Sequence, residues 1–213
     1  RHGLRRAREF LTSASLPDAN MYAAWVEYFS PEERAQMLPE DTAPKSPIAE
    51  LYQKSPSDHP LDAMQQTDLQ SFLPSNLLAY GDAMSMRHSL ELRLPLIDHR
   101  LVDAVGTLAP GLRVQDGMKT LLRAVAQKLL PTHIVDAPKR GFNPPMGVWL
   151  KNDLASMVKD RLTPERMADV GLAWEPIDQL LSEHHGSRRD HSLKVWALLV
   201  LDTWRDSRRG SIN

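Results

Sequence analysis

Hydrophobic positions recur every three or four residues along most of the chain, the spacing that lines one face of an α-helix. Residues 18–38 read in this way as two short helices, and residues 118–130 as a longer one. The second early helix carries a start signal: Ser30 as N-cap, Pro31 at the first helical position and Glu33 three residues after the cap. No internal repeat or run of β-branched strands is evident. The pattern predicts a predominantly α-helical chain.

The same spacing predicts helices over residues 1–13, 61–72, 147–162, 175–183 and 190–204. The last of these has a broad apolar face that we expect to be among the most buried in the chain, formed by Leu193, Trp196, Ala197, Val200, Leu201 and Trp204. Nearby, His184, His185 and His191 lack a carboxylate at a ligand spacing, so we interpret them as surface residues and expect no metal site.

Two proline-rich segments interrupt the helical pattern. Residues 39–60 contain five prolines and read as a surface connection. Residues 131–145 contain four prolines together with Lys139, Arg140 and Gly141, and predict an ordered, non-helical excursion that can present a cation. Gly141 would let the backbone pass close to a ligand, although relief of crowding against Phe142 explains it equally well.

The pattern changes midway through residues 82–100. Helical spacing holds up to Leu90, and then Leu92, Leu94 and Leu96 alternate with other residues, as in extended chain. Pro95 restricts the residue before it to extended geometry, so the helix is predicted to end near Glu91. Asp98 is then placed to cap a helix over residues 101–108.

Glu91 is the candidate for chemistry in this stretch. It would lie at a helix exit between two apolar neighbours, where partial burial could raise its carboxyl pKa toward the range useful to a general base. The alternative is a surface glutamate paired with Arg87 or Arg93. The residues alone favour the ion pair.

Composition narrows the class of protein. A chain of 213 residues with 42% hydrophobic residues and a net charge of −1 can bury a substantial core and does not suggest a nucleic-acid partner. The absence of cysteine excludes disulfides and a cysteine nucleophile within the chain. No apolar run reaches the roughly 18 residues of a membrane span, so a cytoplasmic location is expected. The chain begins with Arg1 in the middle of an amphipathic pattern, which suggests a fragment.

Three sequence blocks, in this order, resemble the synthetase domain of the asparagine synthetase family. The first is Ser85-Met86-x-His88-Ser89-Leu90-Glu91-x-Arg93-x-Pro95-x-x-Asp98-His99-Arg100-Leu101. The second is Lys119-x-Leu121-Leu122-Arg123, followed by Leu129-Leu130-Pro131. The third is Pro138-Lys139-Arg140-Gly141-Phe142, followed by Pro144 and Trp149-Leu150. The resemblance covers residues 73–150 well and the flanks loosely.

The resemblance implies a fold as well as a family. The chain would be the mainly α, helical C-terminal part of an α/β synthetase domain of the ATP-pyrophosphatase type, which is adenine nucleotide alpha hydrolase-like. Residues 1–72 would form a helical lead-in, 73–150 the region with the family motifs, and 151–213 the C-terminal helices. The family's Ser-Gly-Gly-x-Asp-Ser phosphate loop, its magnesium-holding Asp-Glu segment and its glutaminase domain do not occur in this sequence. The missing synthetase half and glutaminase domain are therefore the expected partners, on the same polypeptide.

The implied reaction is ATP-dependent amide formation. Aspartate or a related small-molecule carboxylate is adenylated and then aminated with glutamine-derived ammonia. The full-length enzyme would use ATP and Mg²⁺. Neither is expected to bind to this fragment, and the fragment alone should be inactive. Two alternatives stay open: an amidotransferase for a different carboxylate, and a helical interaction module that has kept the sequence without the chemistry.

The resemblance assigns Glu91 as the proton acceptor for the attacking nitrogen, and Lys139 as the cation that stabilises charge on the adenylate, intermediate or pyrophosphate. The two are expected to converge on one cleft. Supporting positions around the substrate and nucleotide would be Asp82, Ser85, Met86, Arg123, Arg140 and Gly141. Ala83, Arg87 and Asn143 depart from the family's usual residues, which leaves the substrate open. Apolar surface from Leu77, Leu92 or Leu94 should be exposed or covered by self-association into a homo-oligomer.

Overall fold

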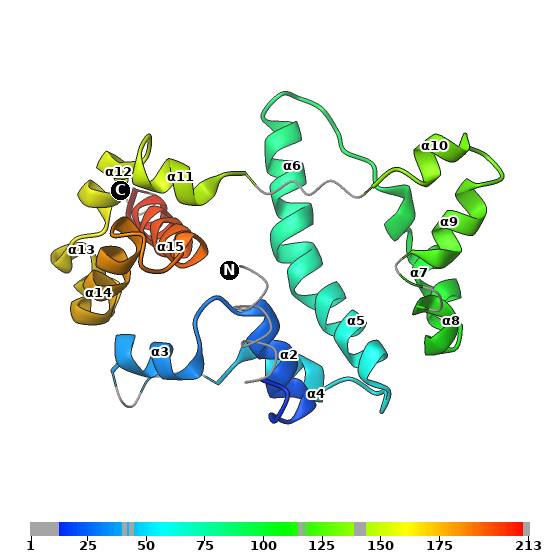
Figure 1. The fold of residues 1–213 in the computed structure, drawn as a ribbon, viewed down its shortest axis with the longest axis horizontal. Helices are drawn as coiled ribbons and strands as arrows, with labels where there is room; N and C mark the ends of the chain where they lie inside the picture. The colour runs from blue at the N-terminus through cyan, green and yellow to red at the C-terminus, as the bar shows by residue number, and fades with distance from the viewer. Residues whose placement is uncertain are drawn as a thin grey trace. The chain divides into compact units, whose positions relative to one another are not determined.

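The computed structural model describes residues 13–39, 42, 45–114, 117, 119–138 and 144–210. Within these residues all regular structure is helical, and no strand occurs, as predicted (Figure 1). None of the helices in the described part of the chain is both long and apolar enough to span a membrane. The helix predicted at the start of the chain lies, apart from Ser13, outside the described residues.

The chain divides into two compact units. Unit 1 combines Arg1–Ala49 with Phe142–Asn213, and unit 2 is Glu50–Gly141. The described helices of unit 1 are α2 (Asp18–Val26), α3 (Pro31–Met37), α11 (Met146–Lys151), α12 (Ala155–Arg161), α13 (Pro164–Ala168), α14 (Trp174–His185) and α15 (Ser192–Gly210). A further helix, α4 (Pro47–Gln53), crosses the boundary between the units.

Local start signals position two short helices of unit 1, α3 and α13. The Ser30 hydroxyl accepts the N–H of Glu33 at 3.2 Å, and the Glu33 carboxylate accepts the N–H of Ser30 at 2.9 Å, so the predicted capping box is confirmed. Thr163 caps α13 in the same way, by accepting the N–H of Arg166. The single helix predicted over residues 147–162 is wrong, because Asn152 leaves the helical region and separates α11 from α12.

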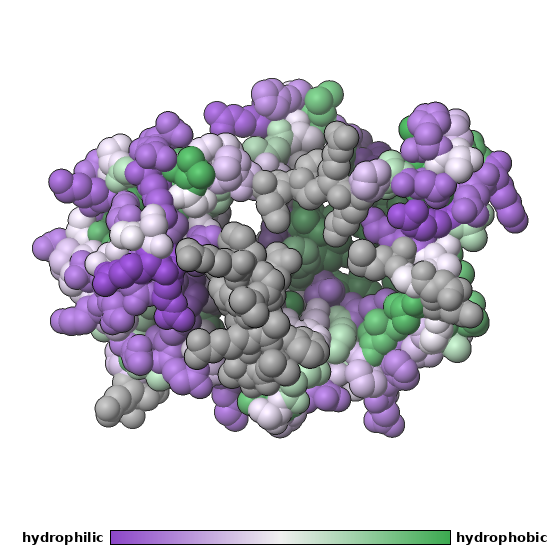
Figure 2. Space-filling model, in the orientation of Figure 1, coloured by the Kyte–Doolittle hydropathy of each residue, from purple (hydrophilic) through white to green (hydrophobic). Residues whose placement is uncertain are grey.

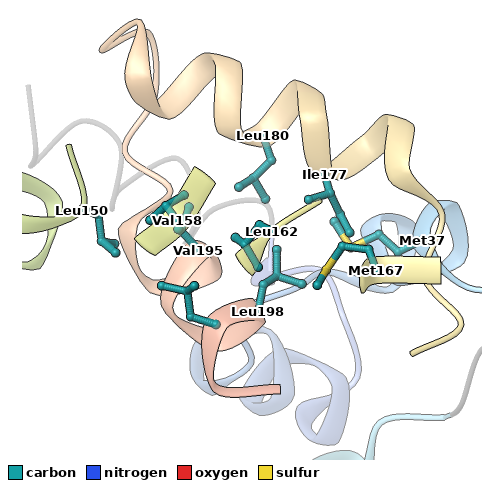
Figure 3. Packing of buried hydrophobic residues seen from close by; sticks show 10 residues of the cluster. Met37, Leu150, Val158, Leu162, Met167, Ile177, Leu180, Val195 and Leu198 are labelled. Carbon is teal, nitrogen blue, oxygen red and sulfur yellow. The ribbon is translucent and has the colours of Figure 1, made fainter. Parts of the chain in front are cut away.

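The core of unit 1 is an apolar cluster in which α11 to α15 meet α3 (Figure 3). Its buried members are Met37, Leu150, Val158, Leu162, Met167, Ile177, Leu180, Val195, Leu198 and Leu199. Full burial of one such side chain stabilises the fold by about 1.5–3 kcal/mol relative to its exposure. A cluster of this size gives unit 1 a core of its own.

The buried face of α15 is not the one predicted. Val195, Leu198 and Leu199 enter the core, and the same face continues through the buried Asp202 and Arg205. Four of the six residues expected inside are exposed: Leu193, Trp196, Val200 and Trp204. Both sides of the helix are apolar near its middle, so periodicity could not choose between them. The observed face also brings Asp202 to arginines on α12 and α13, a partnership invisible in the helix itself.

Unit 2 has little core within the described residues. Its helical elements are α5 (Pro60–Gln70), the π-helix η1 (Leu73–Leu78), α6 (Ala79–Met86), the 3-10 helix η2 (Pro95–Ile97), α7 (His99–Gly106), α8 (Pro110–Val114), α9 (Thr120–Ala126) and α10 (Thr132–Val135). Only Ala63, Thr67 and Val135 are buried among its described residues. Leu77, Leu92 and Leu94 are exposed, which confirms the prediction of uncovered apolar surface.

As predicted, the helix that begins at Pro60 stops before Pro74: α5 ends at Gln70, and Ser71 leaves the helical region. A second helical run then starts, in which η1 leads directly into α6. Pro74 lies in the first turn of η1, where a missing N–H leaves no helical hydrogen bond unmade. Ser75 donates its N–H to the carbonyl of Ser71 at 3.0 Å. Ser75 and Asn76 therefore lie inside a helical run that leads to the motif-bearing stretch.

Candidate functional site

The end of α6 sets the position of the motif-bearing stretch. Ser89 has a φ of 57°, a left-handed conformation that is uncommon for serine. Its N–H donates to the carbonyl of Met86, and the N–H of Leu90 donates to the carbonyl of Ser85. These two hydrogen bonds form a Schellman motif, which closes a helix and turns the chain away from its axis. The helix thus ends earlier than predicted, at Met86, with Glu91 beyond the turn.

After the turn, the extended chain folds back against α6. A Cβ atom added to Gly81 would lie 3.0 Å from Cδ2 of Leu92, so a side chain at position 81 would press on Leu92. Glu91 and Arg93, the neighbours of Leu92 in the sequence, both have exposed side chains. The segment that carries Glu91 therefore approaches α6 at Leu92 and leaves the Glu91 side chain in solvent.

Glu91 forms a surface ion pair. Its Oε1 lies 2.7 Å from Nη2 of Arg93, and the side chains are 67% and 83% exposed, respectively. The expectation of partial burial is therefore wrong for Glu91 in this chain, and the ion pair weighed as the alternative is present. An exposed pair contributes about 0–1 kcal/mol, so it holds the carboxylate loosely and leaves it accessible to a proton donor.

The residues after Glu91 follow the prediction in part, because Leu96 lies in a 3-10 helix where extended chain was expected. Pro95 starts η2, and Asp98 caps α7 by accepting the N–H of Arg100 at 2.9 Å, which confirms the predicted N-cap. The Arg100 side chain also donates to both carboxylate oxygens of Asp98. These hydrogen bonds, first from the guanidinium and then from the backbone, lower the pKa of Asp98. The motif is thereby anchored at both ends, at Ser89 and at Asp98.

Three of the predicted supporting residues lie on α6. Asp82 is exposed in its first turn, and Ser85 donates its hydroxyl to the carbonyl of Asp82 at 3.2 Å. Met86 is exposed at the end of the helix. The carbonyls of Ser85 and Met86 both accept the bonds that turn the chain toward Glu91. Their contribution in this structure is to position the Glu91 segment.

Arg123 supports a different segment. From α9 it donates to the carbonyl of Val135 at 2.7 Å, at the end of α10. This bond fixes the described chain just before Pro138. Lys139, Arg140 and Gly141 lie outside the described residues. The convergence of Glu91 with Lys139 stays a prediction.

Exposed apolar side chains surround Glu91 along the sequence. They are Met84, Met86, Leu90, Leu92, Leu94 and Leu96. Figure 2 shows hydrophobic surface, in green, where Figure 1 draws the helices of unit 2. Contiguous apolar surface of this kind marks a binding surface or an interface. A molecule that covered it would take Glu91 out of water.

A resident magnesium ion does not fit the described residues. Mg²⁺ prefers oxygen ligands with near-ideal octahedral geometry. No group of three or more His, Cys, Asp or Glu side chains that could hold a metal ion occurs in the described ranges, and the Glu91 carboxylate is paired with Arg93.

Sequence reasoning missed two features of this site. Ser89 carries no signal for a left-handed conformation, since glycine or asparagine is the usual residue there. Gly81 could have been noticed as a glycine inside a helical pattern, where close approach of another segment is a common reason for it. Both help to set the path of the chain that carries Glu91.

The helical fold carries the motif from Ser85 to Leu101, which resembles the C-terminal part of a synthetase domain. The family model for asparagine synthase matches residues 2–206. This chain belongs to the asparagine synthase family.

Curated relatives agree with this assignment. Over 93% of its length the chain is 27% identical to asparagine synthetase (glutamine-hydrolyzing) 1 of Bacillus subtilis. Over the same share it is 26% identical to a putative asparagine synthetase (glutamine-hydrolyzing) of Mycobacterium bovis. Over 53% of its length the chain is 27% identical to amidase chyE of Penicillium rubens, and it covers 18% of that protein. The chain spans about a third of the length of the two synthetases, 32% and 31%. No solved structure gives a significant match.

Proposed function

We propose that this chain is the C-terminal part of the synthetase domain of an ATP-dependent ligase that aminates aspartate or a related carboxylate. Membership of the asparagine synthase family supports the class of reaction. The observation that carries the site is the folded-back segment that holds Glu91 outward, between the Schellman turn at Ser89 and the capped start of α7. The remainder of the domain would supply the phosphate-binding loop and the magnesium ligands.

In this proposal Glu91 accepts a proton from ammonia as the nitrogen attacks the acyl-adenylate, whose bond to AMP then breaks to leave the amide. Arg93 orients the carboxylate until substrate binds. The apolar residues around Glu91 exclude water once the remainder of the domain covers them. Lys139 stabilises the negative charge that develops on the adenylate or pyrophosphate. Without the rest of the domain the chain has no synthetase activity.

The test uses the full-length protein and separates adenylation from amide formation. Glu91→Gln keeps size and hydrogen bonding but removes the proton acceptor, so amide formation should slow by about two to four orders of magnitude while ATP binding survives. Lys139→Ala should impair formation or breakdown of the adenylate, by about 3 kcal/mol of transition-state stabilisation. The matched control is Glu50→Gln, an exposed glutamate of α4, which should leave both steps unchanged.

Amide synthesis at the wild-type rate in both variants would refute the assignment of Glu91 and Lys139. Pyrophosphate release from ATP, aspartate and ammonia by the 213-residue chain alone would refute the expectation that it is inactive.

A second candidate keeps the reaction and changes the substrate. The relative in Penicillium rubens is named an amidase, so not every protein similar to this chain is named for asparagine. Aspartate should be compared with other carboxylates as acceptors of the amide nitrogen.

A non-catalytic interaction module is supported instead if the reading frame upstream lacks a Ser-Gly-Gly-x-Asp-Ser motif.

A further inference from the structure

His184 is a buried histidine in the last turn of α14. Its side chain is 1% exposed, so the prediction of a surface residue is wrong for His184. It is also wrong for His191, which is buried, and correct for His185. Its Nδ1 accepts the backbone N–H of His191 at 3.2 Å, which ties the end of α14 to the residue before α15. A nitrogen that accepts carries no proton, so the neutral ring carries its proton on Nε2. Nε2 is buried and has no hydrogen-bond partner among the described residues.

The first turn of α11 packs on the same ring. A Cβ atom added to Gly147 would lie 3.9 Å from Cε1 of His184 and 3.6 Å from Oδ1 of Asp190. At the other end of α11, Lys151 donates from Nζ to the hydroxyl of Ser187 at 2.9 Å. The helix is therefore held at both ends against the connection between α14 and α15, with Leu150 buried beneath it. Movement of the ring would displace α11.

Protonation of His184 conflicts with this arrangement. A proton on Nδ1 would face the N–H of His191, so a hydrogen bond would become a contact between two donors. Burial is the main cause that lowers the pKa of His184, and the nearby Lys151 cation is the next. His185 and His191 lower the pKa of His184 as well. The Asp190 carboxylate, whose Oδ1 is 3.9 Å from Nδ1, acts in the opposite direction.

The other titratable groups around the connection between α14 and α15 do not oppose the packing of α11 on the His184 ring. His191 Nε2 lies 2.8 Å from the Glu183 carboxylate, so a proton on His191 would strengthen that contact. Arg189 approaches the same carboxylate at 3.8 Å. His185 is exposed. Among these three histidines, His184 is the one whose ring nitrogen accepts a backbone N–H, so it is the one that must stay neutral.

We propose that His184 is a pH-sensitive latch, which holds α11 and residues 186–191 closed while its ring is neutral and releases them when it takes a proton. In the open form the ring would titrate near its ordinary pKa of about 6.5. Below that pH the open form takes up the proton first, so the opening equilibrium constant rises by up to tenfold per pH unit. Above about pH 7 the latch is closed. The proposal does not depend on the ligase function.

Amide hydrogen exchange of the 213-residue chain, corrected for intrinsic rates, tests the latch at pH 7.5, 5.5 and 4.5. Peptides covering residues 146–151 and 186–192 should lose protection about tenfold between pH 7.5 and 5.5. Peptides of α13 should lose much less, because that helix lies outside the latch. Equal loss throughout unit 1 would overturn the proposal.

Three variants identify the titrating group. His184→Asn keeps an acceptor near the place of Nδ1 and does not titrate, so it should lose the pH response, whereas His185→Asn, at the exposed neighbour, should keep it. Asp190→Asn still accepts the N–H of Ser192 but removes the carboxylate that favours protonation, so protection should fall further at pH 4.5. A pH response retained in His184→Asn would overturn the latch. If that variant does not fold, an Asp190→Asn response equal to wild type would overturn it.

Discussion

Asp202 offers the sharpest test of how unit 1 is held together. Its carboxylate is fully buried and accepts four hydrogen bonds. Nε of Arg161 donates at 2.7 Å, Nε and Nη2 of Arg166 at 2.9 and 2.8 Å, and Nη2 of Arg205 at 2.9 Å. Burial alone would raise the pKa of Asp202, but these guanidinium groups outweigh it and hold the pKa below its ordinary range. One carboxylate thereby joins α12, α13 and α15.

Asp202→Asn keeps the shape of the side chain but not the charge. One oxygen remains as acceptor, while the new amide group faces guanidinium donors. Removing one partner of a buried ion pair costs about 3–5 kcal/mol. Arg161 and Arg166 remain partly exposed and keep Asp206 as a second partner, so we expect the lower end, about 3 kcal/mol.

Tryptophan fluorescence during urea unfolding measures this change, because all five tryptophans belong to unit 1. With an m-value of about 1.5–2 kcal/mol/M, the midpoint should fall by about 1.5–2 M urea. The matched control is Asp169→Asn, a half-exposed partner of Arg205 and Arg209, which should cost less than about 1 kcal/mol. An Asp202→Asn midpoint within error of the control would refute the reasoning.

Acid should weaken the same cluster in the wild type. Arg166 and then Arg205 lower the pKa of Asp206 to about 2, and the pKa of Asp202 is lowered as well. A carboxylate with a lowered folded-state pKa stabilises above its unfolded value of about 3.9 and stops doing so as the pH falls through the folded value. The free energy of unfolding of unit 1 should therefore drop between about pH 4 and 2, and Asp202→Asn should show a smaller drop.

Two further predictions concern unit 2. Ser89→Gly should stabilise the end of α6 by up to about 1 kcal/mol, because glycine accepts a positive φ without strain. Amide hydrogen exchange at residues 79–90 should therefore slow, and an unchanged exchange rate would contradict the prediction. The exposed apolar surface should bind a hydrophobic dye or drive concentration-dependent association of the 213-residue chain, and substitution of Leu90 and Leu94 by Ser should reduce both; sedimentation as a monomer without dye binding would contradict it.

Local signals were sufficient wherever a short-range contact decides the structure. The capping box of Ser30 and Glu33 and the N-cap at Asp98 were predicted, because each joins residues two or three positions apart. The helical class followed from the spacing of apolar residues. The motif around Glu91 pointed to the family that the match over residues 2–206 then established.

Where competing local preferences are close in energy, longer-range contacts decided the local conformation. Pro74 is tolerated because η1 begins there, and α6 ends at a serine in a conformation its sequence does not favour. Glu91 is exposed next to Leu92, which folds back onto Gly81 across eleven positions.

The buried face of α15 and the burial of His184 were beyond sequence reasoning for the same reason. Trp196 and Trp204 are more apolar than Asp202 and Arg205, yet the polar pair is inside. Spacing within one helix reports which residues share a face, but not which face meets partners from elsewhere in the chain. Arginines on α12 and α13 and the start of α11 supply those partners, so the sequence determined the helices and the family, and only tertiary packing decided what they bury.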